Sequence, residues 1–293
     1  MTAPPGRLRL AFLGTPEASV PTLRAVVAAG HEVALVVTRP DRRRGRGSAL
    51  VPSPVKAVAL AEGITVTEDV DDVLDAGVDL GVVVAFGRLI KPHVLEQVPM
   101  VNVHFSLLPR WRGAAPVERA ILAGDTETGV CLMAVEAGLD TGPVYRCERV
   151  DIGAEETADE LRGRLATIGT SLLVEELDKG LGPSTPQEGD ATYAAKLEPH
   201  ELRLDWSRPA AELQRVVRLG RAWTIFRGRR LRVLRAAVVE EGPAVGVLDG
   251  TVVGVGDGRG LALQDVQAEG RGATPAVDWL RGARPSAGER LGP

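Results

Sequence analysis

A parallel α/β domain followed by a small antiparallel β-barrel is the fold that the sequence predicts, from three observations. Short apolar runs alternate with helical patterns through the first half of the chain. Residues 180–190 then lack periodicity and are rich in glycine and proline. Beyond them, short apolar runs are separated by turn signals such as Asp249-Gly250 and Asp257-Gly258. Strands that alternate with helices favour a parallel sheet, and closely spaced strands with tight turns favour an antiparallel barrel.

The first half of the chain supplies the predicted α/β domain. Apolar runs predict strands at residues 8–13, 33–38, 80–85, 101–104, 130–135 and 144–150. Helices are expected up to residue 29, near residues 55–62 and over residues 158–177. Thr157 and Glu160 have the spacing of a capping box at the start of the last helix. Ligands of such a sheet bind beyond the carboxyl ends of the strands, so a site is expected there.

The second half is expected to form a separate domain. Its strands are predicted at residues 231–239, 244–248, 251–255 and 260–266. We therefore place a first domain at residues 1–180, a linker at residues 181–200 and a second domain at residues 201–293.

Composition excludes several classes of protein. The net charge of −4 excludes a general polyanion binder, so any contact with nucleic acid must use a local patch. Cys131 and Cys147 are too few for a disulfide framework, and we expect them to be reduced, free thiols. The apolar run at residues 10–13 is too short for a signal peptide, and no run is long enough to cross a bilayer. These features predict a soluble cytoplasmic protein, with no obligate protein partner evident.

Common cofactor and metal motifs are missing from the sequence. Gly14 is a single tight-turn glycine where a dinucleotide-binding fold needs Gly-x-Gly-x-x-Gly. Residues 45–48 lack the lysine and the upstream glycine of a P-loop. The four histidines are scattered without ligand spacing, so we expect no metal site.

The segment Asn102-Val103-His104 carries the clearest chemical signal. Residues two apart on a strand face the same side, so Asn102 and His104 project together near the carboxyl end of a buried strand. An amide N–H stabilises the oxyanion of a tetrahedral intermediate, and an imidazole takes or gives a proton near neutral pH. The pair therefore suits acyl transfer, although polar residues also end strands without any catalytic role.

Asp140 is the candidate for a third catalytic residue. It lies in a glycine-punctuated loop, residues 136–143, between two apolar strands. A carboxylate at this place would orient the imidazole and favour its protonated form. Turn formation alone also explains an aspartate in a glycine loop, so the residue type leaves both interpretations open.

The segments around these three residues resemble the 10-formyltetrahydrofolate-dependent formyltransferases. The resemblance is carried by Asn-x-His-x-Ser-Leu-Leu-Pro at residues 102–109, Arg-Trp-Arg-Gly-Ala-Ala-Pro at residues 110–116 and Gly-Leu-Asp-Thr-Gly at residues 138–142. Similar segments at residues 14–17, 39–41, 52–56 and 263–267 extend it over nearly the whole chain. Within the family, the chain is most similar to members that formylate the methionine of initiator tRNA.

The resemblance implies a Rossmann-like parallel-sheet catalytic domain followed by an OB-like barrel that binds tRNA. The implied reaction transfers the formyl group of 10-formyltetrahydrofolate to the α-amino group of initiator methionyl-tRNA, without a metal. It assigns catalysis to Asn102, His104 and Asp140. The implied folate-binding residues are Phe86, Gly87, Leu89, Ser106, Leu107, Leu108 and Pro109. We expect the neutral amine to attack the formyl carbon directly, while Asn102 and protonated His104 stabilise the oxyanion and Asp140 orients His104.

Two arginine-rich segments are expected to meet tRNA phosphates. The first is a glycine-bearing loop that contains Arg42, Arg43, Arg44 and Arg46. The second spans residues 203–235, where ten arginines oppose two acidic residues and Trp206, Trp223 and Phe226 lie among them. Barrels of this kind often bind nucleic acid by charge, but an ordinary solvated surface is the alternative.

Three other functions compete with this hypothesis. A sugar-amine N-formyltransferase would share the donor and the catalytic residues but act on a nucleotide-linked amino sugar. A folate deformylase is disfavoured, because the first strand begins soon after Met1 and leaves no place for an added small domain. A noncatalytic RNA-binding protein would keep the barrel and the arginines but would have no reason to keep Asn102, His104 and Asp140 together.

Overall fold

The computed structural model describes residues 6–43 and 50–292. The chain divides into two compact units. Unit 1 comprises Met1–Val117, Glu127–Asp151 and Arg162–Ala195, and unit 2 comprises Glu118–Thr126, Ile152–Leu161 and Lys196–Pro293. Unit 2 therefore combines the C-terminal part of the chain with two short segments from the N-terminal half. Within the described ranges, no helix has both the length and the apolar character that a membrane span requires.

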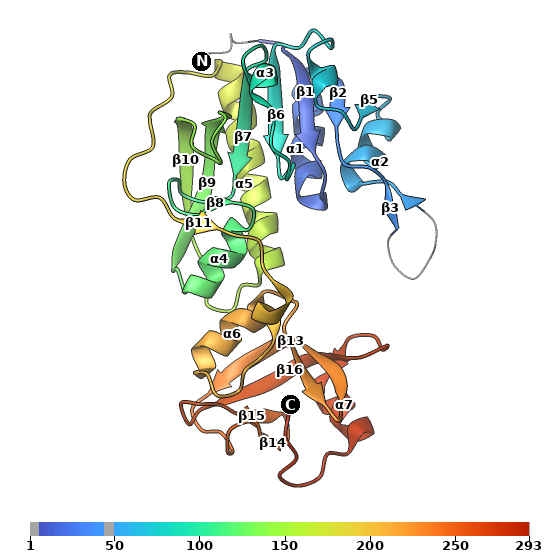
Figure 1. The fold of residues 1–293 in the computed structure, drawn as a ribbon, viewed down its shortest axis with the longest axis vertical. Coiled ribbons are helices and arrows are strands. Elements are labelled where there is room, and N and C mark those ends of the chain that lie inside the picture. Colours follow the sequence, from blue (N-terminus) through green and yellow to red (C-terminus); the bar gives the residue numbers. More distant parts are fainter. Residues whose placement is uncertain (1–5, 44–49, 293) are drawn as a thin grey trace. The chain divides into compact units, whose positions relative to one another are not determined.

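Unit 1 is built on a mixed sheet of seven described strands, in the order β10-β9-β7-β6-β1-β2-β5 (Figure 1). Their bounds are β1 Arg9–Gly14, β2 Glu32–Val37, β5 Thr65–Thr67, β6 Leu80–Val84, β7 Met100–His104, β9 Glu127–Ala134 and β10 Val144–Asp151. Strands β5, β2, β1, β6 and β7 pair in parallel, which confirms the predicted α/β sheet. β9 runs antiparallel to β7, and β10 antiparallel to β9.

The helices of the N-terminal half have local start signals that the sequence shows. Their bounds are α1 Val20–Ala28, α2 Pro54–Ala61, α3 Pro92–Leu95, α4 Pro116–Ala123 and α5 Ala158–Lys179. At the start of α5, the backbone N–H of Thr157 donates to Glu160 Oε2 at 2.8 Å, and that of Glu160 donates to Thr157 Oγ1 at 3.3 Å. The predicted capping box is thus confirmed. The hydrogen bonds from Thr157, backbone first, lower the pKa of Glu160 below its usual value.

Helix α5 packs closely against β7 and β9, the strands that carry and adjoin the candidate site. A Cβ at Gly169 would lie 2.6 Å from Val103 Cγ1 and 2.9 Å from Val130 Cγ1, so the helix approaches the sheet only because this residue has no side chain. A hydrogen bond of 2.8 Å between the buried hydroxyls of Thr22 and Thr170 also joins α1 to α5. The backbone of β7 is therefore held from behind by close packing.

Two short strand pairs complete the N-terminal half. β3, Arg42–Arg43, pairs antiparallel with β4, Leu50–Val51. β8, Arg112–Gly113, pairs in parallel with β11, Tyr193–Ala194. The second pair brings the segment expected as a linker alongside the loop that follows β7.

Unit 2 contains an antiparallel sheet of six described strands, as the sequence predicts, with order β12-β13-β16-β15-β14 and with β17 on β16. The bounds are β12 Trp223–Phe226, β13 Arg229–Val239, β14 Leu248–Asp249, β15 Val252–Gly254, β16 Gly260–Ala268 and β17 Thr274–Pro275. Helices α6, Ala210–Arg218, and α7, Ala276–Ala283, accompany the sheet. The strand expected at residues 244–248 is mostly wrong, because Gly246 adopts a left-handed φ of 74° and only Leu248 joins a strand.

The expectation of free thiols is also wrong in this structure, since Cys131 and Cys147 form a disulfide. The antiparallel register of β9 and β10 places the two residues directly opposite each other, with their Cα atoms 4.1 Å apart. Their separation of 16 residues in the sequence does not reveal this pairing, because it depends on the register of the hairpin.

The two glycines within α5 offer a matched test of the packing. A Cβ at Gly163 would meet no atom within 4 Å, so Gly163→Ala should stabilise the protein by about 0.5–1 kcal/mol through helix propensity. Gly169→Ala should instead destabilise it by about 1–3 kcal/mol, because Val103 and Val130 must move. Urea unfolding of both variants measures the difference. Shifts of the same sign and size would contradict the close packing of α5.

Candidate active site

The structure brings Asn102, His104 and Asp140 together. His104 is the last residue of β7, and Asn102 projects from the same face of that strand. Asp140 Oδ2 lies 3.6 Å from His104 Nδ1, and Asp140 Oδ1 lies 3.4 Å from Asn102 Nδ2. The side chains of His104 and Asp140 are 6% and 16% exposed, so water screens this ion pair only weakly. One carboxylate thus faces both side chains of β7.

The loop that carries Asp140 must fold back along β7. Because β9 runs antiparallel to β7, Ala134 lies beside Val101, away from His104. The return is tight, since a Cβ at Gly142 would lie only 1.9 Å from the carbonyl oxygen of Ala134. Asp140 itself adopts a left-handed φ of 50°. The glycines of this loop are therefore required by its path, and the aspartate does more than form a turn.

Backbone groups fix the Asp140 carboxylate and the His104 ring. The N–H of Gly113 donates to Asp140 Oδ2 at 2.7 Å. His104 Nε2 lies 2.9 Å from the carbonyl oxygen of Trp111, to which it donates when protonated at that nitrogen. Both ring nitrogens consequently face oxygen atoms, Nε2 at hydrogen-bond distance and Nδ1 at the longer distance of an ion pair. Trp111 is held in turn by its N–H, which donates to Thr192 Oγ1 at 2.9 Å.

Gln187 connects three parts of this site and was missed by the sequence analysis. Its Nε2 donates to the carbonyl oxygens of Asp140 and Gly142, at 2.8 Å each. Its Oε1 accepts hydrogen bonds from Nε and Nη2 of Arg112, at 3.0 and 2.7 Å. Gln187 lies in the glycine- and proline-rich segment expected as a linker, so its sequence context carries no signal of a site. Only the tertiary path of residues 185–194 reveals the contact.

The residues expected to bind folate lie in the loops after β6 and β7, which are adjacent parallel strands. Ser106 is buried, and its hydroxyl donates to the carbonyl of Arg110 at 2.6 Å. Leu107, Leu108 and Pro109 are half-buried, with a cis bond between Leu108 and Pro109.

The loop after β6 presents both buried and exposed apolar surface. Phe86 is buried, and Gly87 adopts a left-handed φ of 66° while its carbonyl accepts from Arg39. Leu89 is 76% exposed. The assignment of these residues to a donor site remains a prediction.

The first arginine segment is described only in part. Arg42 and Arg43 are exposed on β3. Arg44 and Arg46 lie outside the described residues.

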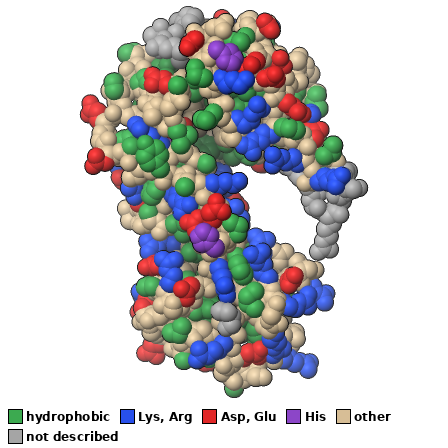
Figure 2. Space-filling model, viewed as in Figure 1, with side chains coloured by type: hydrophobic (Ala, Val, Ile, Leu, Met, Phe, Trp, Pro, Cys, Tyr) green, Lys and Arg blue, Asp and Glu red, His purple; other side chains and the backbone are tan. Residues whose placement is uncertain are grey.

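The second arginine segment is less positive than its sequence suggests. Acidic side chains pair with its arginines, all but one of them from outside the segment, and Figure 2 shows blue and red side chains interspersed over unit 2. The pairs are Arg208–Glu212, Arg221–Glu118, Arg227–Glu289, Arg229–Glu269 and Arg235–Glu160. Arg218 is buried and donates to the carbonyls of Gly153 and Glu156, so it is a structural residue.

No cluster of three or more His, Cys, Asp or Glu side chains that could hold a metal ion occurs in residues 6–43 and 50–292. The site itself presents one amide, one imidazole, one carboxylate and backbone groups. Such a set suits the stabilisation of a tetrahedral intermediate.

Comparison with known proteins gives matches over most of the chain. The family model described as formyl transferase matches residues 8–177, and that described as formyl transferase, C-terminal domain, matches residues 196–284. The methionyl-tRNA formyltransferase of Jannaschia sp. (strain CCS1) is 45% identical over an alignment 302 positions long, which covers 97% of this chain and 100% of that protein.

Solved structures share the fold. The methionyl-tRNA formyltransferase from Clostridium thermocellum has a TM-score of 0.57 at 18% identity, and covers 78% of this chain and 93% of its own. An N-formyltransferase from Helicobacter canadensis, in complex with folinic acid and dTDP-3-aminofucose, has a TM-score of 0.67 at 16% identity, and covers 88% of this chain and 99% of its own. At these identities the likeness concerns the fold alone.

Gln187→Leu tests whether residue 187 holds the Asp140 loop. The variant keeps the volume but removes the hydrogen bonds to the loop, so the protein should lose about 1–3 kcal/mol of stability. Amide hydrogen exchange at residues 138–142 should become faster. Gln97→Leu is the control, because Gln97 is exposed and its side-chain amide donates to the carbonyl of His93, away from the Asp140 loop. Unchanged exchange at residues 138–142 would show that the loop holds its own shape.

Proposed function

Because the chain belongs to the methionyl-tRNA formyltransferase family, we propose that it transfers the formyl group of 10-formyltetrahydrofolate to the α-amino group of initiator methionyl-tRNA. The observation that carries the mechanism is the convergence of Asn102 and His104 on the Asp140 carboxylate. A folate-type donor is supported by the similar fold of the Helicobacter canadensis protein, whose structure contains folinic acid. A cytoplasmic location belongs to the same proposal, because charged tRNA is used there.

The reaction begins with the neutral amine of methionine. A free α-amino group has a pKa of roughly 7.7–8.0, so deprotonation costs little near neutral pH. Its nitrogen attacks the formyl carbon, and negative charge develops on the formyl oxygen. The new carbon–nitrogen bond forms, the bond to the folate nitrogen breaks, that nitrogen takes a proton and the amine loses one. No covalent intermediate with the protein is needed.

Asn102 is the side chain best suited to hold the developing oxyanion. One N–H of its amide faces Asp140 Oδ1 at 3.4 Å, and the other has no partner among the described residues. That second N–H is free to donate to the formyl oxygen. A donor placed in this way acts most strongly where charge appears in the transition state.

His104 and Asp140 complete the electrostatics. When protonated, His104 donates to the Trp111 carbonyl and faces the Asp140 carboxylate. These two contacts hold the ring in place, so its positive charge stays near the oxyanion. Asp140 keeps the ring oriented and assists removal of the amine proton. The hydrogen bond from the Gly113 N–H holds the Asp140 carboxylate in the orientation in which its oxygens face β7.

The donor is assigned to the two loops that follow β6 and β7. The set consists of Phe86, Gly87, Leu89, Ser106, Leu107, Leu108 and Pro109. The support for this assignment is that the two loops follow adjacent parallel strands, at the end of the sheet where ligands of such folds bind. The backbone of residues 85–90 supplies hydrogen-bonding groups for the edge of a pterin.

One assay tests the proposed function. The full chain is incubated with 10-formyltetrahydrofolate and offered charged initiator tRNA, charged elongator tRNA, an amino-sugar nucleotide or buffer. We expect formylation of charged initiator tRNA. Preferred formylation of the amino sugar, or release of formate in buffer, would assign the chain to a different activity.

Asn102→Ala and Asn102→Asp test the oxyanion donor. Both remove the amide N–H, and the second keeps the shape of the side chain. Turnover should fall by about 100- to 1,000-fold in both. Urea unfolding should change little in Asn102→Ala, whereas Asn102→Asp should lose stability because its carboxylate would lie beside that of Asp140. Steady-state formylation of charged tRNA measures the effect. Turnover near the wild-type value in Asn102→Asp would remove this role from Asn102.

Arg42→Gln/Arg43→Gln tests the first arginine segment as a phosphate contact. Each phosphate contact that is lost should reduce the slope of log affinity against log salt by about 1, so the slope should fall by about 1–2. Filter binding of initiator tRNA at several salt concentrations measures it. Arg7→Gln/Arg24→Gln is the control, because both residues are exposed in unit 1 outside this segment. Equal slopes in the two double variants would exclude phosphate contacts by Arg42 and Arg43.

A further inference from the structure

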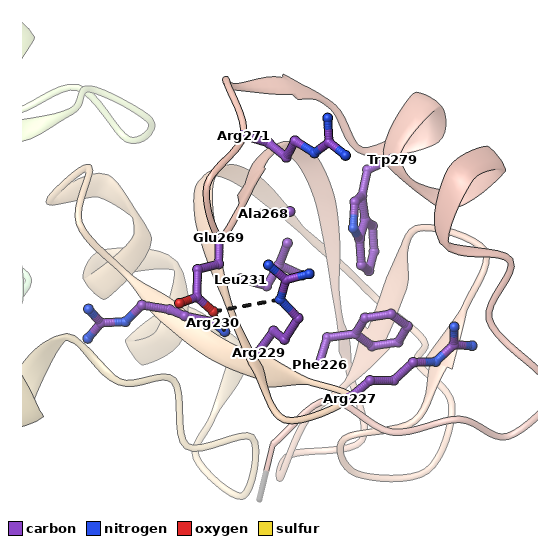
Figure 3. Close-up of a pocket in the computed structure, with 9 residues that line it drawn as sticks. All are labelled: Phe226, Arg227, Arg229, Arg230, Leu231, Ala268, Glu269, Arg271 and Trp279. Carbon is purple, nitrogen blue, oxygen red and sulfur yellow. Dashed lines mark hydrogen bonds and ion pairs between the residues drawn. The ribbon is translucent and has the colours of Figure 1, made fainter. Parts of the chain in front are cut away.

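Unit 2 contains a pocket of about 220 Å³ that the proposed mechanism does not use (Figure 3). It lies where β12, β13 and β16 meet α7. The residues that line it are Phe226, Arg227, Arg229, Arg230, Leu231, Ala268, Glu269, Arg271 and Trp279. Aromatic and basic side chains thus dominate its walls.

Two aromatic rings form the apolar wall. Phe226 of β12 and Trp279 of α7 meet edge to face, with ring centroids 5.1 Å apart and planes at 75°. Both rings are half-buried and pack on the core of unit 2. Each therefore keeps part of its surface toward the pocket. Aromatic surfaces of this kind stack with nucleobases of any sequence.

Two of the arginines that line the pocket already interact with other residues of the chain. Arg227 pairs with Glu289 and lies 4.8 Å from the centroid of Phe226, so it fixes the wall. Arg230 lies 4.0 Å from the ring of Trp223, and Figure 3 shows its side chain directed away from the two rings of the pocket.

Arg229 and Arg271 remain to meet a ligand. Arg229 has only a long contact with Glu269, at 3.9 Å. Arg271 is exposed, and its guanidinium has no partner among the described residues. Two cationic groups at the mouth of an aromatic pocket suit a nucleotide, because the cations attract its phosphate and the aromatic rings stack on its base.

We propose that this pocket binds one unpaired nucleotide of an RNA chain. The base contacts Phe226 and Trp279, and the phosphate meets Arg229 and Arg271. The volume is below the roughly 300–1,000 Å³ of sites for larger ligands, which suits a single base. The proposal rests on the proposed function in one respect, that the RNA in question is the tRNA substrate.

A neighbouring aromatic residue supports an RNA chain over an isolated nucleotide. Trp223, on the same strand as Phe226, has the guanidinium groups of Arg203 and Arg230 at 5.6 and 4.0 Å from its ring centroid. Residues three apart on a strand face opposite sides, so an RNA chain that leaves the pocket would have to pass around the edge strand β12 to meet this second combination of arginine and aromatic ring. Single-stranded RNA is bound elsewhere by such alternation of charge and stacking surface.

The test measures the binding of a fluorescein-labelled single-stranded RNA, tetraadenylate, to the full chain by fluorescence anisotropy. Trp279→Leu removes the stacking surface, and Arg271→Gln removes a charge at an exposed position where the fold does not need it. Each should weaken binding at least about 5-fold, the lower end of the effect of one lost base stack or charged contact. Arg281→Gln is the matched control, because Arg281 lies on α7, is 79% exposed and is absent from the pocket. It should change affinity by less than about 2-fold.

Three results would overturn the proposal. Equal affinities of Arg271→Gln and Arg281→Gln would show only general charge attraction. A blunt RNA duplex that binds as tightly as tetraadenylate would show that no unpaired base is needed. Displacement of the probe by polyglutamate as effectively as by unlabelled tetraadenylate would indicate a surface for acidic peptides. Urea unfolding of Trp279→Leu verifies its fold, and Arg271→Gln decides the matter if that variant does not fold.

The outcomes also separate this inference from the proposed function. A wild-type chain that formylates charged initiator tRNA but does not bind tetraadenylate keeps the function and loses the pocket. A chain that binds tetraadenylate and formylates no acceptor keeps the pocket and loses the function. The KM for charged tRNA should rise in Arg271→Gln while kcat stays near its wild-type value, because the pocket does not touch the reacting atoms.

Discussion

The Asp140 carboxylate is the constraint on which the candidate site depends. One of its oxygens accepts from the Gly113 N–H and faces His104, and the other faces Asn102. Those groups come from a strand, from the loop after it and from a separate glycine loop. A carboxylate that is only 16% exposed would be costly without these partners, so the three segments must all be in place for the site to exist. The packing of α5 on β7 and the contacts of Gln187 serve this single arrangement.

The antiparallel placement of β9 explains why the site needs support from a distant segment. A parallel strand would end beside His104, whereas β9 ends beside Val101 and its loop must return along β7. Residues close to this loop in the sequence offer it few hydrogen bonds. Gln187 and Thr192 supply the hydrogen bonds that the loop and the Trp111 backbone lack, and both come from the segment after α5. A stretch with the composition of a linker thus acts as part of the site.

The parts that sequence predicts well are those set by local periodicity. The alternation of side chains along a strand places Asn102 and His104 on one face, and the pairing of Thr157 with Glu160 is a contact within one helical turn. The disulfide between Cys131 and Cys147 and the role of Gln187 depend on register and on tertiary paths. No residue type or spacing in the sequence predicts such contacts. The left-handed turn at Gly246 breaks an expected strand for a local reason that the apolar pattern conceals.

The charge of a surface is also hard to predict from the sequence, because residues from distant parts of the chain contribute to it. The local sum over residues 203–235 is strongly positive, but Glu118, Glu160 and Glu289 bring negative charge to it from distant parts of the sequence. This compensation reduces the positive charge of the segment without cancelling it, and surface charges are screened within about 8–10 Å at physiological salt, so the long-range field of the segment is weaker than its sequence suggests. What remains is a few uncompensated arginines beside aromatic rings. Recognition by unit 2 should therefore depend more on contact with bases and less on attraction to a distant polyanion, which is consistent with a chain whose net charge is −4.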